Sequence, residues 1–264
     1  MYFSDTQRDI SAESFANTGL PVIMSIRGLV RRLYHSLPIR LQCLVHAALR
    51  AGKVAVGSGS YIHPTVHLIG KMNINVGSNT CISEGCWFNV NHRTIGAVAI
   101  HIGDNCFIGK QNFFTSGKSI DVGDFTLTAL GCRFIGSSHK VGNPDVPYLL
   151  TSTTDFEEIK IGVNCFLGAG VTVLGHVKVG HGSVIGANSL VLTDIPPFSL
   201  AHGNPATVLK RYSFKKRIWI AATELSAEEE ASMPSEQLYL SNLRINFPVV
   251  HMPWIAAGKS MGDL

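Results

Sequence analysis

Branched aliphatic residues recur at every sixth position between residues 161 and 195. The positions are Ile161, Leu167, Val173, Val179, Ile185 and Val191. The residue four places after each aliphatic is mostly small, and glycine often follows the aliphatic directly. A hexapeptide period predicts a parallel β-helix, in which each unit forms one short strand and one corner. Three units then make a triangular coil, and the aliphatic side chains fill its centre.

The same aliphatic register continues back to Val56, with Thr128 as the one poor match. The register slips by two residues at Val76 and at Val122, and by eight before Ile102. We interpret each slip of two as a widened corner. The pattern as a whole predicts a mainly β fold, a parallel β-helix of about six coils.

A much longer slip, of 21 residues, separates His139 from Ile161. It predicts an extruded loop over residues 140–160. Loops of this length inside a compact repeat are usually functional or disordered. The β-helix domain is expected over residues 54–212, followed by a C-terminal extension, 213–264. In that extension Ser226 and Glu229 have the spacing of a helix-opening capping box.

Residues 1–53 have a different pattern, a polar arm followed by two amphipathic helices. The first helix has apolar residues spaced by three and four and stops at Pro38. The second is expected over residues 39–49. The segment 21–53 carries several arginines and no acidic residue. A cationic amphipathic helix can make peripheral contact with an anionic membrane. The alternative, which we favour, is a helix that caps the open end of the β-helix.

Composition excludes several classes of protein. The 264 residues are 45% hydrophobic and 15% charged, and their net charge of +4 is too dispersed to favour nucleic acid. The first ten residues lack a secretory signal, and no uncharged run approaches the ~20 residues needed to span a bilayer. Four cysteines occupy the small interior position of the repeat: Cys86, Cys106, Cys132 and Cys165. Buried reduced thiols indicate a cytoplasmic protein without a zinc site.

One stretch near the end of the repeat resembles a known family. The run Ile185-Gly-Ala-Asn-Ser-Leu-Val-Leu-Thr-Asp-Ile-Pro-Pro, followed by Gly203-Asn-Pro-Ala, resembles the hexapeptide-repeat acyltransferases. The resemblance is greatest to galactoside- and maltose-type O-acetyltransferases and to enzymes of capsule, exopolysaccharide and O-antigen synthesis. It implies a left-handed β-helix, a homotrimer with active sites between subunits, and acetyl-CoA as co-substrate with no metal.

His139 is the candidate general base. By resemblance, the catalytic histidine of these enzymes lies where a coil leads into the long loop, and His139 has this place at the end of the fourth coil. Acetyl transfer from a thioester to a sugar hydroxyl needs a base for the hydroxyl proton, and a positioned histidine contributes roughly 10²–10⁴-fold. The thiol is a good leaving group, so direct transfer needs no covalent intermediate. Lys140 departs from the family, where proline or an acid often follows the histidine.

The resemblance also implies binding residues. Those for acetyl-CoA are Ala169, Ala187 and Thr193 at outer corners, Lys210 with Arg211 for the 3′-phosphate, and Phe166 near the thioester. Those for the acceptor are Gln111 or Asn112 one coil before the base, and Asn143 and Asp145 in the loop. Small residues at the corners leave room for the pantetheine arm, although the repeat favours small residues there in any case.

The resemblance implies an O-acetyltransferase acting on a sugar hydroxyl of a cell-envelope polysaccharide, and several alternatives stay open. An amino-sugar N-acetyltransferase or a serine O-acetyltransferase would need the same base. His176 and His181 have a spacing similar to that of the zinc ligands in γ-class carbonic anhydrases, but no third ligand is evident. A non-catalytic β-helix that scaffolds glycan assembly is the remaining alternative.

Overall fold

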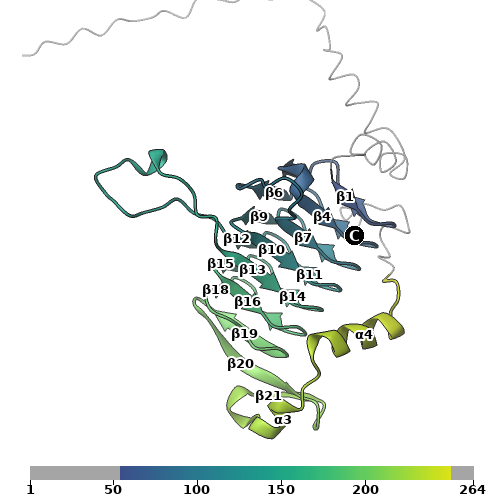
Figure 1. Ribbon diagram of the computed structural model, residues 1–264. Helices are drawn as coiled ribbons and strands as arrows, with labels where there is room; N and C mark the ends of the chain where they lie inside the picture. Colours follow the sequence, from purple (N-terminus) through teal and green to yellow (C-terminus); the bar gives the residue numbers. More distant parts are fainter. Residues whose placement is uncertain (1–53, 251–264) are drawn as a thin grey trace, which may run out of the picture. The chain divides into compact units, whose positions relative to one another are not determined.

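The computed structural model describes residues 54–250, and short parallel strands dominate this part of the chain (Figure 1). The strands form three sheets, named A, B and C here in the order in which the chain first enters them. Each coil contributes one strand to every sheet, and neighbouring strands pair parallel and in register. The predicted fold, a left-handed parallel β-helix of six coils, is confirmed.

The strand bounds show how short each side of the triangle is. Sheet A contains β1 (Ala55–Val56), β4 (Ile74–Val76), β7 (Ile100–Ile102), β10 (Ser119–Val122), β13 (Glu158–Ile161) and β16 (Val177–Val179). Sheet B contains β2 (Tyr61–Ile62), β5 (Cys81–Ile82), β8 (Phe107–Ile108), β11 (Leu127–Thr128), β14 (Phe166–Leu167) and β17 (Val184–Ile185). Sheet C contains β3 (His67–Ile69), β6 (Trp87–Val90), β9 (Phe113–Ser116), β12 (Arg133–Ile135), β15 (Thr172–Leu174) and β18 (Leu190–Val191).

The interior of the prism is filled by the aliphatic register that the sequence predicts. From the second coil onward its first-position residues are almost completely buried, including Ile82, Ile108 and Leu167. Thr128, the poor match, is also fully buried, and its hydroxyl accepts a hydrogen bond from the Gly109 amide at 3.2 Å. Burying each large apolar side chain stabilises the fold by about 1.5–3 kcal/mol. The core therefore runs the length of the coils.

A column of aromatic rings lies inside sheet C. Phe88, Phe114 and Phe134 stack with ring centroids 4.4 Å apart in both pairs, and Val173 continues the column above Phe134. Close parallel packing of this kind adds about 0.5–1.5 kcal/mol per pair beyond area burial. The column supports the strand from which the long loop leaves, because Phe134 belongs to β12.

The slips of two residues lengthen a strand, so the prediction that they widen a corner was wrong. Ile74 and Val76 both lie in β4 and both point inward, and Ile120 and Val122 do the same in β10. Side chains alternate along a strand with a period of two, so two additional residues preserve the inward register. From the second coil onward, the strands of sheet A are thus longer than the two-residue strands that the coils contribute to sheet B.

The corners depend on residues that tolerate a left-handed backbone. Asn79, Asn105, Asn164 and Asn188 have φ values of 54°, 55°, 53° and 58°. Asparagine adopts this conformation more readily than other residues with a side chain. Each of these asparagines therefore lies in the corner between two strands and allows the chain to enter the next sheet.

The predicted interior cysteines are confirmed as buried free thiols. Cys86, Cys106, Cys132 and Cys165 are between 0% and 1% exposed. Burial raises the pKa of Cys86, Cys106 and Cys165 to about 12, and that of Cys132 to about 11. Thiols with such values are almost entirely protonated at neutral pH and are poor nucleophiles.

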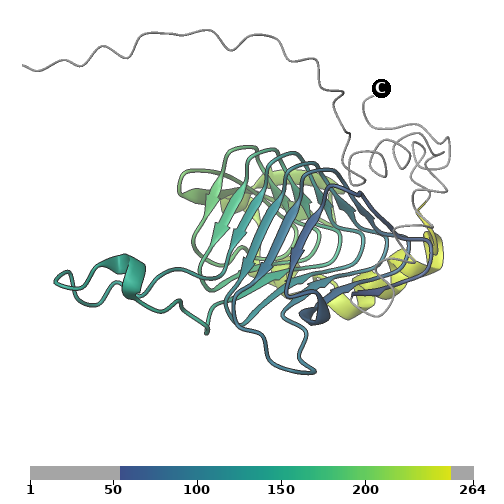
Figure 2. The ribbon, with the colours of Figure 1, turned by 90° about the horizontal axis from the view of Figure 1, so that it is seen from above.

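Two insertions leave the prism between sheets C and A (Figure 2). The shorter one, residues 91–99, joins β6 to β7. The longer one, residues 136–157, joins β12 to β13 and contains the 3-10 helix η2 (Tyr148–Leu150). It starts and ends earlier than residues 140–160, because β13 already begins at Glu158. A further 3-10 helix, η1 (Lys71–Asn73), lies before β4.

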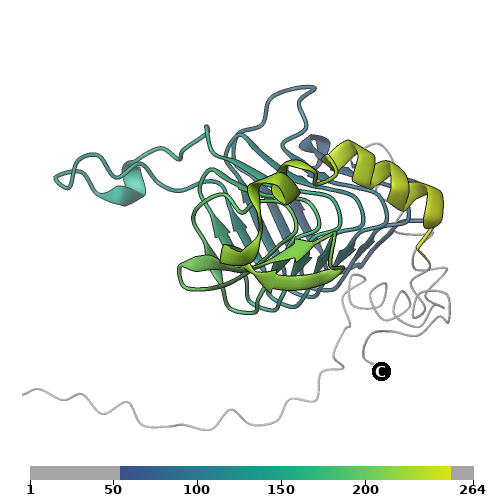
Figure 3. The same cartoon turned by 90° about the horizontal axis from the view of Figure 1, so that it is seen from below.

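Three further strands of sheet B and two helices follow the last coil. The strands and the first helix close the far end of the prism, and the second helix runs back beside the coils (Figure 3). They are β19 (Ser199–Gly203), β20 (Ala206–Ser213), β21 (Ile218–Ala221), α3 (Ala227–Ala231) and α4 (Glu236–Asn246), with η3 (Ala222–Glu224) between β21 and α3. Ser226 caps α3 by accepting a hydrogen bond from the Glu229 amide, as the capping-box spacing predicts. The Glu229 carboxylate instead accepts from Ser213 and Lys215, so the box is half formed.

Within residues 54–250 no helix is both long and apolar enough to cross a membrane. The predicted arm and cationic helices at residues 1–53 lie outside the described residues.

Candidate active site

His139 lies at the base of the 136–157 loop, where the chain leaves β12. The two arms of the loop pair antiparallel there: His139 bridges Thr153, the Thr154 amide donates to the Ser138 carbonyl at 2.7 Å, and the Lys140 amide donates to the Ser152 carbonyl at 2.9 Å. The imidazole itself is exposed. A short backbone ladder therefore presents the candidate base to its surroundings at the edge of the coil.

The partner of the His139 ring determines which nitrogen carries the proton. Nδ1 lies 3.1 Å from the Thr151 carbonyl oxygen and 3.3 Å from Thr151 Oγ1. The carbonyl can only accept, and the Thr151 hydroxyl donates its own proton to the Tyr148 carbonyl at 2.8 Å. Nδ1 must therefore be the donor, which leaves the lone pair on Nε2. This is the tautomer that a general base requires, and the sequence did not predict Thr151 as its cause.

The residues predicted to bind acetyl-CoA fall on two different edges of the prism. Ala169 and Ala187 occupy the corner between sheets B and C in the fifth and sixth coils, and Ala169 accepts a hydrogen bond from the Asn188 amide at 2.8 Å. Phe166, 40% exposed, points outward from sheet B just before this corner. Thr193 follows β18 and lies at the edge between sheets C and A, as does His139.

Lys210 and Arg211, predicted together at the 3′-phosphate, lie on opposite faces of β20. Lys210 is exposed, whereas Arg211 is 7% exposed. The Arg211 guanidinium contacts Glu230 Oε1 at 2.8 Å and Met233 Sδ at 3.6 Å. Successive residues of a strand point to opposite faces, so the two cations cannot serve one ligand from the same side. Arg211 instead binds the segment around α3 to the end of the prism.

The four predicted acceptor residues are also separated. Asn112 is 1% exposed, and its amide donates to the carbonyls of Gly109, Lys110 and Ala129, so it supports a corner from within. Gln111 is exposed with φ 57°, on the edge between sheets B and C. Asn143 and Asp145 are exposed in the loop, where Asn143 Oδ1 accepts from the Asp145 amide at 3.0 Å.

A second polar group lies on the outer face of sheet C, and no motif in the sequence points to it. The Asn89 amide donates to Asn91 Oδ1 at 2.7 Å, and Asn91 donates to Thr115 Oγ1 at 2.9 Å. Beside it, Trp87 is 46% exposed and packs between His67 and Phe113. Sequence patterns indicate that these positions face outward, but not which outward residues contact one another.

His176 and His181 flank β16 at its two ends. His176 is exposed and its Nδ1 accepts from the Glu158 amide at 3.3 Å. His181 lies at the corner after β16 and is 7% exposed, because its ring packs against Phe198 and its Nε2 donates to the Pro234 carbonyl at 3.0 Å. In the described part of the chain no cluster of three His, Cys, Asp or Glu side chains could hold a metal ion.

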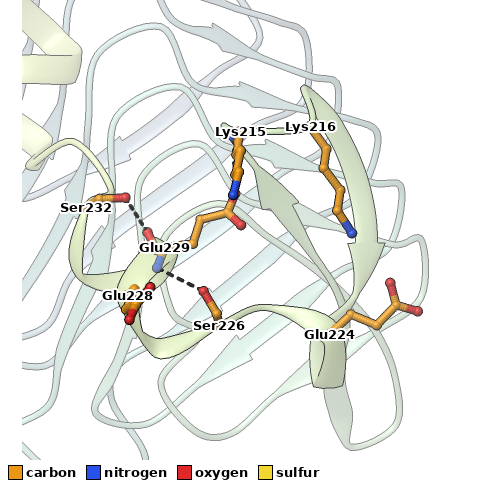
Figure 4. A pocket seen from close by; sticks show the side chains of 7 residues that line it. All are labelled: Lys215, Lys216, Glu224, Ser226, Glu228, Glu229 and Ser232. Atoms are coloured by element: carbon orange, nitrogen blue, oxygen red, sulfur yellow. Dashed lines mark hydrogen bonds between the residues drawn. The ribbon is translucent and has the colours of Figure 1, made fainter.

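Two hollows lie elsewhere on the prism, and neither includes His139. Figure 4 shows the first, of about 590 Å³, lined by Lys215, Lys216, Glu224, Ser226, Glu228, Glu229 and Ser232. The hydrogen bond from Ser213 lowers the pKa of Glu229, whose main chain also bonds Ser226 and Ser232. The second, of about 390 Å³, lies between sheet A and Glu236 of α4. The groups lining the first already stabilise the end cap.

Two sequence models of hexapeptide families match the chain. The one described as "Bacterial transferase hexapeptide (six repeats)" matches residues 158–193, and "Hexapeptide repeat of succinyl-transferase" matches residues 99–124. Both ranges lie inside the β-helix. They confirm the predicted resemblance to the hexapeptide-repeat transferases.

Proteins similar in sequence to this chain include acetyltransferases. A probable acetyltransferase of Mycobacterium tuberculosis, Rv3034c, is 28% identical over 185 residues, which is 69% of this chain and 57% of that protein. The putative lipopolysaccharide biosynthesis O-acetyl transferase WbbJ of Escherichia coli is 28% identical over 154 residues, 56% of this chain and 76% of WbbJ. The chain thus spans little more than half the length of the mycobacterial relative.

Solved structures share the fold at low identity. A point mutant of AntD, an N-acyltransferase from Bacillus cereus solved with dTDP-4-amino-4,6-dideoxyglucose and coenzyme A, has a TM-score of 0.55 and 15% identity. The match covers 76% of this chain and 95% of AntD. This likeness supports the β-helix architecture that the three sheets define.

Proposed function

We propose that the protein is an acetyl-CoA-dependent O-acetyltransferase that acts on a sugar hydroxyl in cell-envelope polysaccharide synthesis. The observation that carries the proposal is the hydrogen bond from His139 Nδ1 to the Thr151 carbonyl, which leaves Nε2 free to accept a proton. The similarity to WbbJ supports the acceptor class. His139 is the only residue to which we assign a step in the chemistry.

The proposed reaction is a direct transfer. Nε2 of His139 takes the proton of the sugar hydroxyl as the oxygen attacks the thioester carbonyl carbon. The carbon–sulfur bond then breaks, and the leaving thiolate of CoA takes up the proton from the imidazolium. The Nδ1–H bond to Thr151 is strengthened while the ring is positively charged, so the loop stabilises the transition state.

For acetyl-CoA we propose the corner between sheets B and C in the last coils. Ala169 and Ala187 lack side chains that would block an extended pantetheine arm, and Phe166 offers an apolar surface beside them. Lys210 is exposed and available for a phosphate, whereas Arg211 is committed to Glu230.

The separation of His139 from the proposed acetyl-CoA corner supports a homotrimer. His139 and the alanine corner lie at different edges of one prism, so in a trimer one subunit's His139 would face a neighbour's corner. The proposed site is then formed between subunits, in the cytoplasm where acetyl-CoA is available.

A second candidate is transfer to an amino group of a nucleotide-linked sugar. The similarity of fold to AntD, whose solved complex contains an amino sugar nucleotide, favours it. An amine acceptor needs the same base, so the arrangement at His139 suits both reactions.

The test is release of the free thiol of CoA with a panel of sugars and nucleotide sugars. His139→Asn keeps a side-chain donor near the Thr151 carbonyl but removes the base, and we expect kcat to fall by about 10²–10⁴-fold. His176→Asn is the matched control and should behave as wild type. Equal thiol release by the His139→Asn protein and the wild type would exclude His139 as the base. Release with amino sugars alone would select the N-acyl reaction.

A further inference from the structure

A histidine from the shorter insertion reaches the base of the loop that carries His139. His92 Nε2 lies 3.1 Å from the Thr154 carbonyl oxygen and 3.0 Å from Thr153 Oγ1, across 62 and 61 residues of sequence respectively. Both contacts are partly buried. Two insertions that leave the prism at different coils are therefore joined by one imidazole.

The partners of His92 also define its protonated nitrogen. The Thr154 carbonyl can only accept, so Nε2–H is the donor, shared with the Thr153 hydroxyl oxygen. The same Thr154 carbonyl accepts from Ser137 Oγ at 3.0 Å, and Thr154 Oγ1 accepts from the Ser138 amide at 3.1 Å. We call the part of the 136–157 loop that leads back to β13 its returning arm. Thr153 and Thr154 hold this arm at the base of the loop.

That arm also carries the carbonyl that orients the candidate base. Thr151, two residues before Thr153, accepts from His139 Nδ1, and His139 bridges Thr153 through the backbone. The positions of the His139 ring and of its acceptor both depend on the ladder held at Thr153 and Thr154. A displacement of about 1 Å at a reacting group can cost roughly 10²-fold in rate.

We propose that His92 is a positioning residue for His139: it joins the 91–99 insertion to the returning arm of the 136–157 loop and holds the Thr151 carbonyl where it sets the His139 tautomer. Its catalytic consequence rests on the proposed function, but the contact between the two insertions does not. In this proposal His92 acts through the loop, and we assign it no step of proton transfer.

Kinetics of His92 variants test the catalytic consequence. His92→Ala should lower kcat about 10- to 100-fold with KM for acetyl-CoA within about twofold, because the thioester contacts are unchanged. His92→Gln places an amide donor near the position of Nε2 and should restore most of kcat. Arg93→Ala is the matched control, since the Arg93 guanidinium donates to the Val90 carbonyl of its own chain segment. It should match wild type in both constants.

Limited proteolysis tests the contact without any substrate. Lys140 is the one trypsin site within residues 136–157, and its amide is bonded in the ladder. We expect cleavage after Lys140 to be several-fold faster in His92→Ala than in wild type, His92→Gln or Arg93→Ala, with the melting temperature of the whole protein little changed.

The outcomes separate the two proposals. Unchanged cleavage and unchanged kcat in His92→Ala, or a glutamine variant no better than alanine, would overturn the positioning role. Faster cleavage in a protein whose wild type releases no thiol with any acceptor would leave the contact established and refute the proposed transferase.

Discussion

The Nη2 atom of Arg244 lies 2.6 Å from Oδ2 of Asp124, a residue 120 positions earlier in the chain. Arg244 is in α4, and Asp124 forms part of the corner between sheets A and B. Near the start of the same helix, Glu236 Oε1 accepts from the Val163 amide at 3.1 Å. Asp104 and Asp124 accept corner amides in the same way, from Ser78 and Asp104. For the Val163 amide, Glu236 of α4 is therefore the acceptor that an aspartate of the next coil is for Ser78 and Asp104.

We predict that Arg244→Met lowers the free energy of unfolding by about 1 kcal/mol, because the guanidinium is half exposed while the Asp124 carboxylate is mostly buried. This corresponds to a fall in Tm of about 2–4 °C. Lys118→Met, which removes an exposed ion pair with Glu158, is the control and should stay within about 0.5 kcal/mol of wild type. Equal stability of both variants would show that α4 is not bound through Arg244.

The carbonyl of Thr151, rather than its hydroxyl, is expected to orient His139. Thr151→Val removes Oγ1 and its bond to Tyr148 but keeps the carbonyl, so kcat should fall less than about tenfold. Ser152→Ala, the adjacent exposed position, should leave thiol release unchanged. A loss in Thr151→Val as large as in His139→Asn would assign the orienting role to the hydroxyl.

Substitution of Lys210 should weaken acetyl-CoA binding, whereas substitution of Arg211 should lower the stability of the fold. Lys210→Ala should raise KM for acetyl-CoA about three- to tenfold without changing Tm, as expected for one exposed charge on a phosphate. Arg211→Ala should lower Tm and leave KM unchanged, because its guanidinium binds Glu230. If Arg211→Ala alone raised KM, the phosphate site would involve the end cap.

The interior thiols should be unreactive until the chain unfolds. With pKa values near 12 for Cys86, Cys106 and Cys165, only ~10⁻⁴ of each would be thiolate at about pH 8. In a Cys43→Ser, Cys81→Ser protein, we expect almost no reaction with a thiol reagent in buffer, and complete reaction in guanidinium. The unfolded chain releases these protons near pH 9 while the folded chain keeps them, so stability should fall above that pH. Rapid modification of the folded protein would show that the corners open.

The sequence predicted some positions of the β-helix and of the candidate site correctly and others not. The hexapeptide period predicted inward positions well, even at Thr128, because a side chain at a first position has no space but the centre of the prism. The interpretation of the two-residue slips as widened corners was wrong, because Ile74 and Val76, like Ile120 and Val122, lie in one strand and share its inward parity. The family resemblance located His139 at the mouth of the loop. Asn112 and Arg211, named with it, are buried: Asn112 bonds corner carbonyls and Arg211 bonds Glu230.

The sequence by itself determined the coils, their number and the place where a long loop leaves them, since a repeat of six residues specifies which side chains face the centre. Only the tertiary structure decided that Thr151 sets the His139 tautomer, that His92 reaches the same loop, and that α4 binds back along a corner. Those contacts join residues about 10 to 120 positions apart through loops and caps outside the repeat. No period relates such positions, so their distances arise only when the coils stack.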